Sequence, residues 1–297
     1  MKKLLSVAAF AVVMTFSGTA FAHYFWVNAS PSFTHMPGHI LMALGFGHQT
    51  PMDDLLVGDF GNIVVDHMKI TGPEGKEFML STPVPKRMEQ KGTPWKSTVE
   101  EGDLAIHKMA MSPGTPKGVY LVSAESKPFV MTKYVNKKGR TKMATKPIDQ
   151  IKDVDKVLES FKYMGFAKSY VNYKGEWKSP QVLNAGLEIT PTVDISSVKP
   201  GDIVSFETKF MGKKLQTDSN NIEYTTAFSD TYGMSDGFQL VSFVMDGKSQ
   251  FRIPEAGNWI VSVYVKRDVD KTPELADLKG KVKVVYYGAT LSFSVKP

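Results

Sequence analysis

Hydrophobic and polar residues alternate along most of the chain in short runs, which is the pattern of β-strands that bury one face. The alternation is clearest over residues 40–48. One face of that run carries Ile40, Met42, Leu44, Phe46 and His48. Further runs rich in Val, Ile, Phe and Tyr are separated by Gly, Pro, Asn and Asp, which favour turns. They cover residues 64–70, 77–80, 104–111, 118–124, 187–193, 203–210, 259–266 and 286–295. We therefore predict a mostly β protein.

Residues 131–185 show a different pattern. Apolar positions there recur at spacings of three or four, as on one face of an amphipathic helix. They are Ile148, Ile151, Val154, Val157, Leu158 and Phe161. Pro147 is suited to the first turn of such a helix. The pattern predicts a linker that contains an amphipathic helix.

The predicted strands fall into two groups on either side of this linker. A chain of this length exceeds the usual size of one sandwich, so two domains are expected. We predict an N-terminal β-sandwich over residues 23–130 and a C-terminal immunoglobulin-like sandwich over residues 186–297. Asp246-Gly247 lies between two strand runs and predicts a hairpin. The predicted fold is thus two tandem immunoglobulin-like β-sandwich domains with a short helical linker.

Residues 1–22 have the three parts of a cleaved secretory signal peptide. Lys2 and Lys3 precede an apolar run at residues 4–16, and Ala20-Phe21-Ala22 supplies the small residues of a cleavage site. The run is shorter than the roughly 20 residues of a membrane-spanning helix. We therefore expect an exported protein that begins at His23 and does not span a membrane after cleavage.

The amino-acid composition excludes several kinds of functional site and indicates the net charge of the protein. The chain has no cysteine, which excludes disulfides, thiolate metal sites and cysteine nucleophiles. The net charge is +6, or +4 without Lys2 and Lys3. One basic cluster stands out: Lys133, Lys137, Lys138, Arg140, Lys142 and Lys146. We interpret it as a solvated linker, with contact to an anionic surface as the alternative. No nucleic-acid partner is expected for an exported chain.

Cleavage before His23 would leave a free α-amine beside an imidazole, and the two nitrogens together chelate one metal ion. A second imidazole completes a histidine brace, which suits copper, whereas further nitrogen or oxygen ligands suit nickel or cobalt. Five of the six histidines lie between positions 23 and 67. His48 ends the apolar stripe of residues 40–48 and has Asp53 nearby, so it is the best second ligand.

The other histidines are weaker candidates. His107 shares a strand face with Met109 and Met111, a soft donor set for Cu(I), although methionine on a strand usually fills a core. His35 and His39 flank a turn and are expected to be solvated, and His67 is expected at the surface. The predicted metal ligands are His23, His48, His107 and Asp53.

Catalytic motifs are scarce. No Gly-x-Ser-x-Gly sequence is present, and paired acids such as Glu100-Glu101 are adjacent, so they point apart on a strand. We therefore expect a protein that is not an enzyme. An N-terminal histidine also begins copper polysaccharide monooxygenases, and the aromatic run Tyr24-Phe25-Trp26 keeps that alternative open.

Several segments in order resemble the bacterial periplasmic proteins of domain-of-unknown-function family 4198. These segments are Ala22-His23-Tyr24-Phe25-Trp26-Val27, Gly45-Phe46-Gly47-His48-Gln49-Thr50-Pro51, Val198-Lys199-Pro200-Gly201-Asp202, Gly212-Lys213-Lys214-Leu215, Phe251-Arg252-Ile253-Pro254-Glu255-Ala256-Gly257-Asn258-Trp259 and Ala289-Thr290-Leu291-Ser292-Phe293.

The resemblance implies tandem immunoglobulin-like sandwiches, a periplasmic location and a role in nickel or cobalt uptake. By position it implies that His23 and His48 are the metal ligands. The expected function is therefore capture of nickel or cobalt for an inner-membrane transporter. The alternatives are a metal-free envelope module that binds carbohydrate or protein and a copper enzyme.

Overall fold

The computed structural model describes residues 23–34, 36, 38–58, 61–178, 183, 186–218, 221–233 and 239–297. The predicted signal peptide and His35 lie outside these residues. The described residues form a mostly β structure of several sheets with three short 3₁₀ helices, Ile148–Gln150, Val269–Lys271 and Pro273–Leu278. The prediction of a mostly β protein is therefore confirmed. Within the described part of the chain, no helix is long and apolar enough to cross a membrane.

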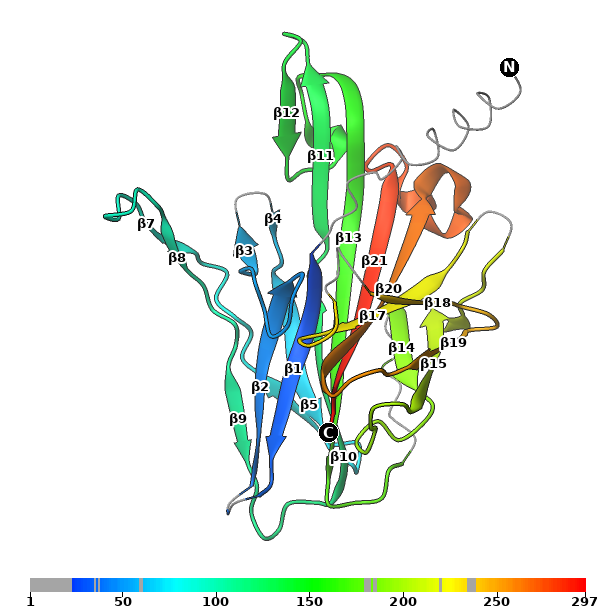
Figure 1. Ribbon diagram of the computed structural model, residues 1–297. Coiled ribbons are helices and arrows are strands. Elements are labelled where there is room, and N and C mark those ends of the chain that lie inside the picture. Colours follow the sequence, from blue (N-terminus) through cyan, green and yellow to red (C-terminus); the bar gives the residue numbers. More distant parts are fainter. Residues whose placement is uncertain are drawn as a thin grey trace, which may run out of the picture.

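Three sheets make up the body of the protein (Figure 1). The first sheet has the order β1 (Tyr24–Ser32), β2 (His39–Gly47), β9 (His107–Ala110). The central sheet has the order β18 (Leu240–Phe243), β17 (Tyr224–Ser229), β20 (Gly257–Asp268), β21 (Val284–Val295), β13 (Val154–Tyr173), β10 (Gly118–Ser126), β5 (Val65–Thr71), β6 (Glu77–Leu80). Strands β11 (Phe129–Asn136) and β12 (Thr141–Ala144) extend it beside β13.

The third sheet contains β14 (Leu187–Pro191), β15 (Ile203–Phe210), β16 (Lys213–Lys214) and β19 (Lys248–Arg252). Two small hairpins stand apart from the three sheets. They are β3 (Val57–Gly58) with β4 (Gly61–Asn62), and β7 (Met88–Gln90) with β8 (Val99–Glu101).

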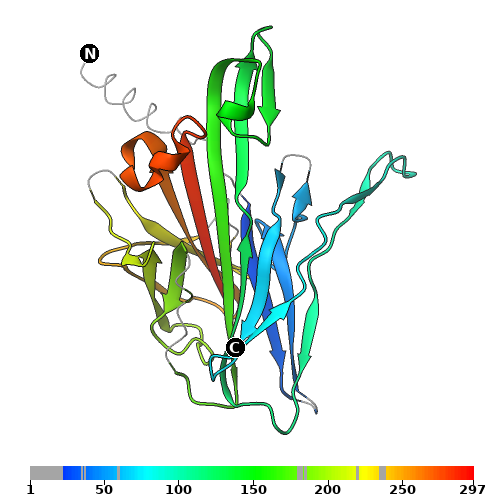
Figure 2. The ribbon, with the colours of Figure 1, turned by 180° about the vertical axis from the view of Figure 1, so that it is seen from behind.

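The first and third sheets pack on opposite faces of the central sheet, as the two views in Figures 1 and 2 agree. Alternate residues of β13 join different cores: Phe161 and Ala167 pack toward the first sheet, whereas Phe166 and Tyr170 pack toward the third. A strand covered on both faces is apolar at nearly every position, not at alternate ones. The central sheet is therefore shared by two sandwich-like layers.

The amphipathic helix predicted in the linker is wrong. Residues 154–173 form the long strand β13, and the helical part of this region is the 3₁₀ turn Ile148–Gln150. The ladder between β11 and β13 shifts register twice, leaving Leu158 and Asp155 without a partner of their own. Ile148 and Ile151 belong to the 3₁₀ turn and its C-cap, and Leu158 is itself a bulge residue that is 43% exposed. The bulge at Asp155 adds one residue between Val154 and Val157, so their spacing is three instead of two. This spacing resembles the period of a helix.

The turn predicted at Asp246-Gly247 is present, and both residues have positive φ angles, 51° and 72°. Met245 and Lys248 exchange backbone hydrogen bonds across it. The flanking strands then separate, because β18 pairs with β17 in the central sheet and β19 pairs with β15 in the third. The turn thus connects two sheets.

Candidate functional site

His23 and His48 lie side by side at one end of the first sheet. Strands β1 and β2 are antiparallel, and their last ladder pair at this end is Tyr24 opposite Gly47. The next residues on the two strands are His23 and His48, whose ring centroids are 4.3 Å apart with the planes tilted by 51°. The Phe46 ring stacks on His23 at 5.1 Å. The strand register therefore creates the histidine pair.

The loop after β2 brings two carboxylates to these rings. Asp54 Oδ2 lies 2.9 Å from His23 Nε2, and Asp53 Oδ2 lies 3.6 Å from His48 Nδ1. The two side chains of the closer pair are partly exposed, 36% for His23 and 46% for Asp54. The backbone N–H groups of both aspartates donate to the carbonyl oxygen of Phe46. The loop is therefore folded back onto the end of β2.

Asp53 also holds the loop together. Its Oδ1 accepts hydrogen bonds from the backbone N–H of His48 at 2.6 Å and of Gln49 at 3.1 Å. Gly47 makes this arrangement possible, because its φ of +118° is rarely adopted by other residues and a Cβ there would overlap Asp53 Oδ1. Asp53 thus positions the loop, and Asp54 is the carboxylate closest to His23.

The strand that carries His23 is fixed to the central sheet through its free edge. The carbonyl oxygens of His23 and Phe25 accept hydrogen bonds from the Tyr264 hydroxyl at 3.1 Å and Thr290 Oγ1 at 2.7 Å. Ser292 Oγ donates in the same way to the carbonyl of Val27. Burial raises the pKa of Tyr264 well above its usual value, so its phenol stays a hydrogen-bond donor. Alternate carbonyls of β1 are thereby satisfied without a partner strand.

The structure does not bring His107 to this site. His107 pairs with Met42 in the middle of β2, and Gly47 is five positions further along that strand. At about 3.3 Å per residue, His107 is on the order of 15 Å from the end of β2. Its Nε2 lies 3.0 Å from the carbonyl oxygen of Ser81. Met109 lines the same hollow as His107 and Met42, which has a volume of about 540 Å³.

The remaining candidates also lie elsewhere. His67 is on the central sheet, between Asp66 at 3.5 Å and Glu125 at 3.7 Å. His39 is at the opposite end of the ladder from His23, paired with Ser32. Met111, predicted on the His107 face, is buried in the core beneath the first sheet.

Two of the predicted ligands, His23 and His48, therefore meet, with Asp53 beside them. Asp54 was outside the predicted set, and its position next to Asp53 was the signal that pointed to it. Among the described residues, no three or more His, Asp or Glu side chains surround one common point as metal ligands would. The site thus offers two imidazoles and a nearby carboxylate that would have to turn toward a shared ion.

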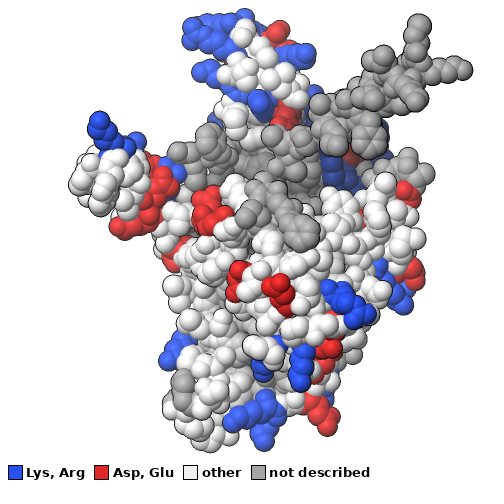
Figure 3. All heavy atoms as spheres, in the orientation of Figure 1, with Lys and Arg blue, Asp and Glu red and all other residues white. Residues whose placement is uncertain are grey.

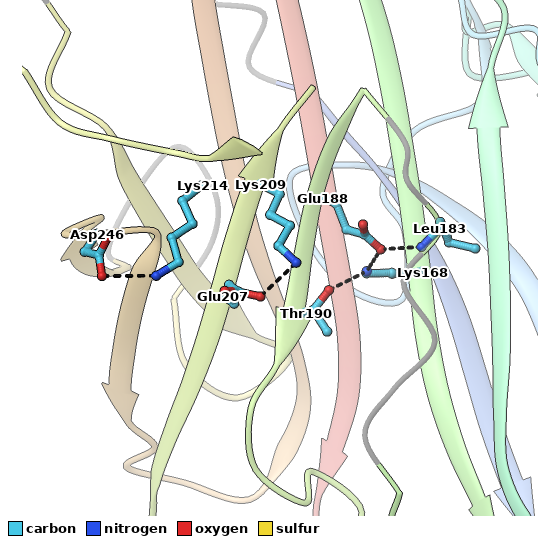
Figure 4. Close-up of polar contacts among 8 residues, drawn as sticks. All are labelled: Lys168, Leu183, Glu188, Thr190, Glu207, Lys209, Lys214 and Asp246. Carbon is cyan, nitrogen blue, oxygen red and sulfur yellow. Dashed lines mark hydrogen bonds and ion pairs between the residues drawn. The ribbon is translucent and has the colours of Figure 1, made fainter. Parts of the chain in front are cut away.

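A second polar cluster lies between the central and third sheets, next to a cavity of about 340 Å³ (Figure 4). Lys168 Nζ is 2.8 Å from Glu188 Oε1 and 3.1 Å from Thr190 Oγ1. The two charged side chains are only 5% and 3% exposed. Burial lowers the pKa of Lys168 to about 8, against the opposing effect of Glu188. Sequence alone gave no signal for this pair, because the two residues lie on strands of different sheets.

Comparison with known families gives one match. A family model described as a domain of unknown function (DUF4198) matches residues 20–267. The chain belongs to this family. The matched region contains His23, His48, both loop aspartates and the Lys168–Glu188 pair, and it ends within β20. The description of DUF4198 assigns no activity, and no curated protein matches the chain.

Proposed function

We propose that this protein captures nickel or cobalt ions in the periplasm and passes them to an inner-membrane uptake transporter. The observation that supports this proposal is the adjacency of the His23 and His48 rings, with Asp54 2.9 Å from His23. The metal ion is cargo in this proposal, so it must bind reversibly. A partly exposed site at the end of a sheet is suited to both loading and release.

The donor chemistry fits these ions. Imidazole nitrogen and carboxylate oxygen are ligands that nickel and cobalt accept, and the chain has no thiolate to favour softer metals. If the signal peptide is cleaved after Ala22, the α-amine of His23 becomes a further donor close to its own imidazole. Metal ions bind the deprotonated imidazole nitrogen, so nickel affinity at this site should fall at acidic pH.

The framework around the site favours a fixed histidine pair. The Tyr264 hydroxyl donates a hydrogen bond to the carbonyl oxygen of His23, and Asp53 accepts one from the backbone N–H of His48. Little reorganisation of these two backbones is then needed for binding. In this proposal the immunoglobulin-like second half, residues 186–297, acts as a docking or spacer module, and its strands share the central sheet with the first half.

The test uses processed protein that begins at His23, confirmed by N-terminal sequencing of exported material. Nickel, cobalt and copper are titrated by calorimetry into this form, into a form with Gly-Ser ahead of His23, and into His48→Ala. Loss of one ligand from a chelate should weaken nickel binding by at least the ~10- to 100-fold that loss of an outer-shell partner typically costs. His67→Ala is the matched control, because His67 also contacts two carboxylates but lies on the central sheet.

Equal nickel affinity of the native and extended forms would exclude the N-terminal site. Copper is expected to bind more tightly than nickel at most nitrogen sites, so copper affinity alone does not identify an enzyme. Turnover of a polysaccharide with peroxide by the copper form would instead support the copper enzyme. Absence of binding for every metal would favour the module that binds carbohydrate or protein.

A further inference from the structure

Strands β11 and β12 form a hairpin that projects beyond the body of the protein, next to the first half of β13 (Figures 1 and 2). Among the described residues, β12 pairs with β11 and with no other strand. The segment that sequence patterning interpreted as a solvated linker is therefore an ordered, protruding β-ribbon.

This hairpin concentrates the positive charge of the chain. Residues 133–146 contain six Lys and Arg residues and no Asp or Glu, which equals the net charge of +6 of the whole sequence. The six are Lys133, Lys137, Lys138, Arg140, Lys142 and Lys146, and all are exposed. In the described part of the chain none of them forms an ion pair with a carboxylate. Figure 3 shows Lys and Arg gathered at the top of the molecule, where Figure 1 places this hairpin.

The tip of the hairpin has a defined geometry. The Asn136 side chain accepts hydrogen bonds from the backbone N–H of Lys138 at 3.1 Å and of Arg140 at 2.9 Å. Gly139 supplies the positive φ of 72° that the turn requires. The charges at the turn are therefore presented on a backbone that is already ordered, so less conformational entropy is lost when they meet a partner.

The basic side chains surround the ribbon. Lys133 lies opposite Met143 in the ladder and Tyr134 opposite Lys142, so the two lysines lie on opposite faces. Met143 is 49% exposed and adds an apolar side chain to the same hairpin. Glu159 of β13 stands opposite Lys133, and Asp153 and Asp155 flank Val154, the ladder partner of Asn136 at the turn. The ladder of β12 faces no acid.

We propose that the β11–β12 hairpin docks end-on onto an anionic phospholipid bilayer. Positive charges on both faces and at the tip do not form one flat face that would match a folded protein. They suit a layer of mobile phosphate headgroups, which can surround the ribbon. An exposed methionine among the lysines adds apolar contact at the headgroup boundary. This inference goes beyond metal capture and does not depend on it.

The test is sedimentation of the full-length processed protein with vesicles of equal phosphatidylglycerol and phosphatidylcholine, and with vesicles of phosphatidylcholine alone. We expect binding to the anionic vesicles at low ionic strength, weakened by added salt because exposed charges are screened. The variant Lys137→Gln/Lys138→Gln/Lys142→Gln should lower the partition coefficient on the order of 100-fold, from about fivefold per charge.

The matched control is Lys117→Gln/Lys178→Gln/Lys199→Gln, which removes the same charge from exposed positions outside the hairpin. It should retain most of the binding. Equal losses in the two triple variants would show that net charge, not the hairpin, attracts the protein. Absence of binding to anionic vesicles at low salt, or equal binding to neutral ones, would also overturn the proposal. Circular dichroism of each variant verifies that the fold is unchanged.

Discussion

His23 and His48 occupy the first positions beyond the β1–β2 ladder, and their ring centroids are 4.3 Å apart. The hairpin register alone brings these two side chains together, although 24 residues lie between them. Antiparallel pairing places consecutive partners at fixed separations, so a pair next to the last ladder pair is also close. The conformation of the loop after β2 then determines which carboxylate lies beside the two rings.

Gly47→Ala should disturb both the loop and the candidate site. A Cβ at position 47 would overlap Asp53 Oδ1 and would be strained at φ +118°. We expect a loss of about 1–3 kcal/mol in the free energy of unfolding, measured by urea denaturation, together with weaker nickel binding. Gly75→Ala is the control, since Gly75 also has a positive φ but no atom within 4 Å of the added Cβ. Weakened nickel binding in both variants would contradict a specific role for Gly47.

Tyr264→Phe should release the backbone of His23. The change removes the hydroxyl that donates to the His23 carbonyl at 3.1 Å. We expect a loss of about 1 kcal/mol in stability and a comparable, about fivefold, loss of nickel affinity. Tyr120→Phe removes a similar hydroxyl bond, to the carbonyl of Pro116 at 2.7 Å, away from the site. Tyr264 acts as a positioning residue only if nickel affinity falls in the first variant and not in the second.

Lys168→Met should destabilise the protein strongly. It leaves the Glu188 carboxylate buried without its cationic partner, which typically costs about 3–5 kcal/mol. The double variant Lys168→Met/Glu188→Leu should recover part of this loss, because no unpaired charge remains. Lys214→Met, which breaks the exposed pair with Asp246, should have little effect. A double variant no more stable than the single one would show that the pair does not act as a unit.

The lowered pKa of Lys168 predicts that the stability of the protein rises at alkaline pH. Burial lowers the pKa of Lys168 to about 8 in the folded state, below the usual lysine value of 10.5. Between these two pH values the unfolded chain holds more protons, so this group makes unfolding less favourable as pH increases. The free energy of unfolding of the parent protein, relative to Lys168→Met, should therefore increase from pH 8 to pH 10. Parallel curves for the two proteins would contradict the lowered pKa.

Features of the fold that depend on local sequence were predicted correctly, whereas those that depend on contacts between distant segments were not. Period-two alternation predicted β2 correctly, and the Asp246-Gly247 turn was found because such turns have a local signature. The strand β13 was mistaken for a helix because a bulge widens the spacing of Val154 and Val157 to three, and because a 3₁₀ turn that contains Ile148 precedes the strand. A bulge is defined by the partner strand, which the sequence of β13 does not reveal.

For the candidate site, too, the sequence predicted some features and the tertiary structure decided others. Sequence pointed to His23 and His48, and to an acid in the segment that follows, because residue type and position carry that information locally. The tertiary structure decided that Asp54 reaches His23 while Asp53 holds the loop, and that His107 stays in the middle of the sheet. Those outcomes depend on backbone hydrogen bonds and strand order between distant segments.

The sequence by itself therefore determined the β class, the histidine pair and the density of positive charge in residues 133–146. Only the tertiary structure decided that one central sheet serves two cores and that the basic segment is a projecting hairpin. Side-chain periodicity records whether a face is buried, but not which sheet covers it. That choice is made by contacts between strands far apart in the chain, such as β13 with β21.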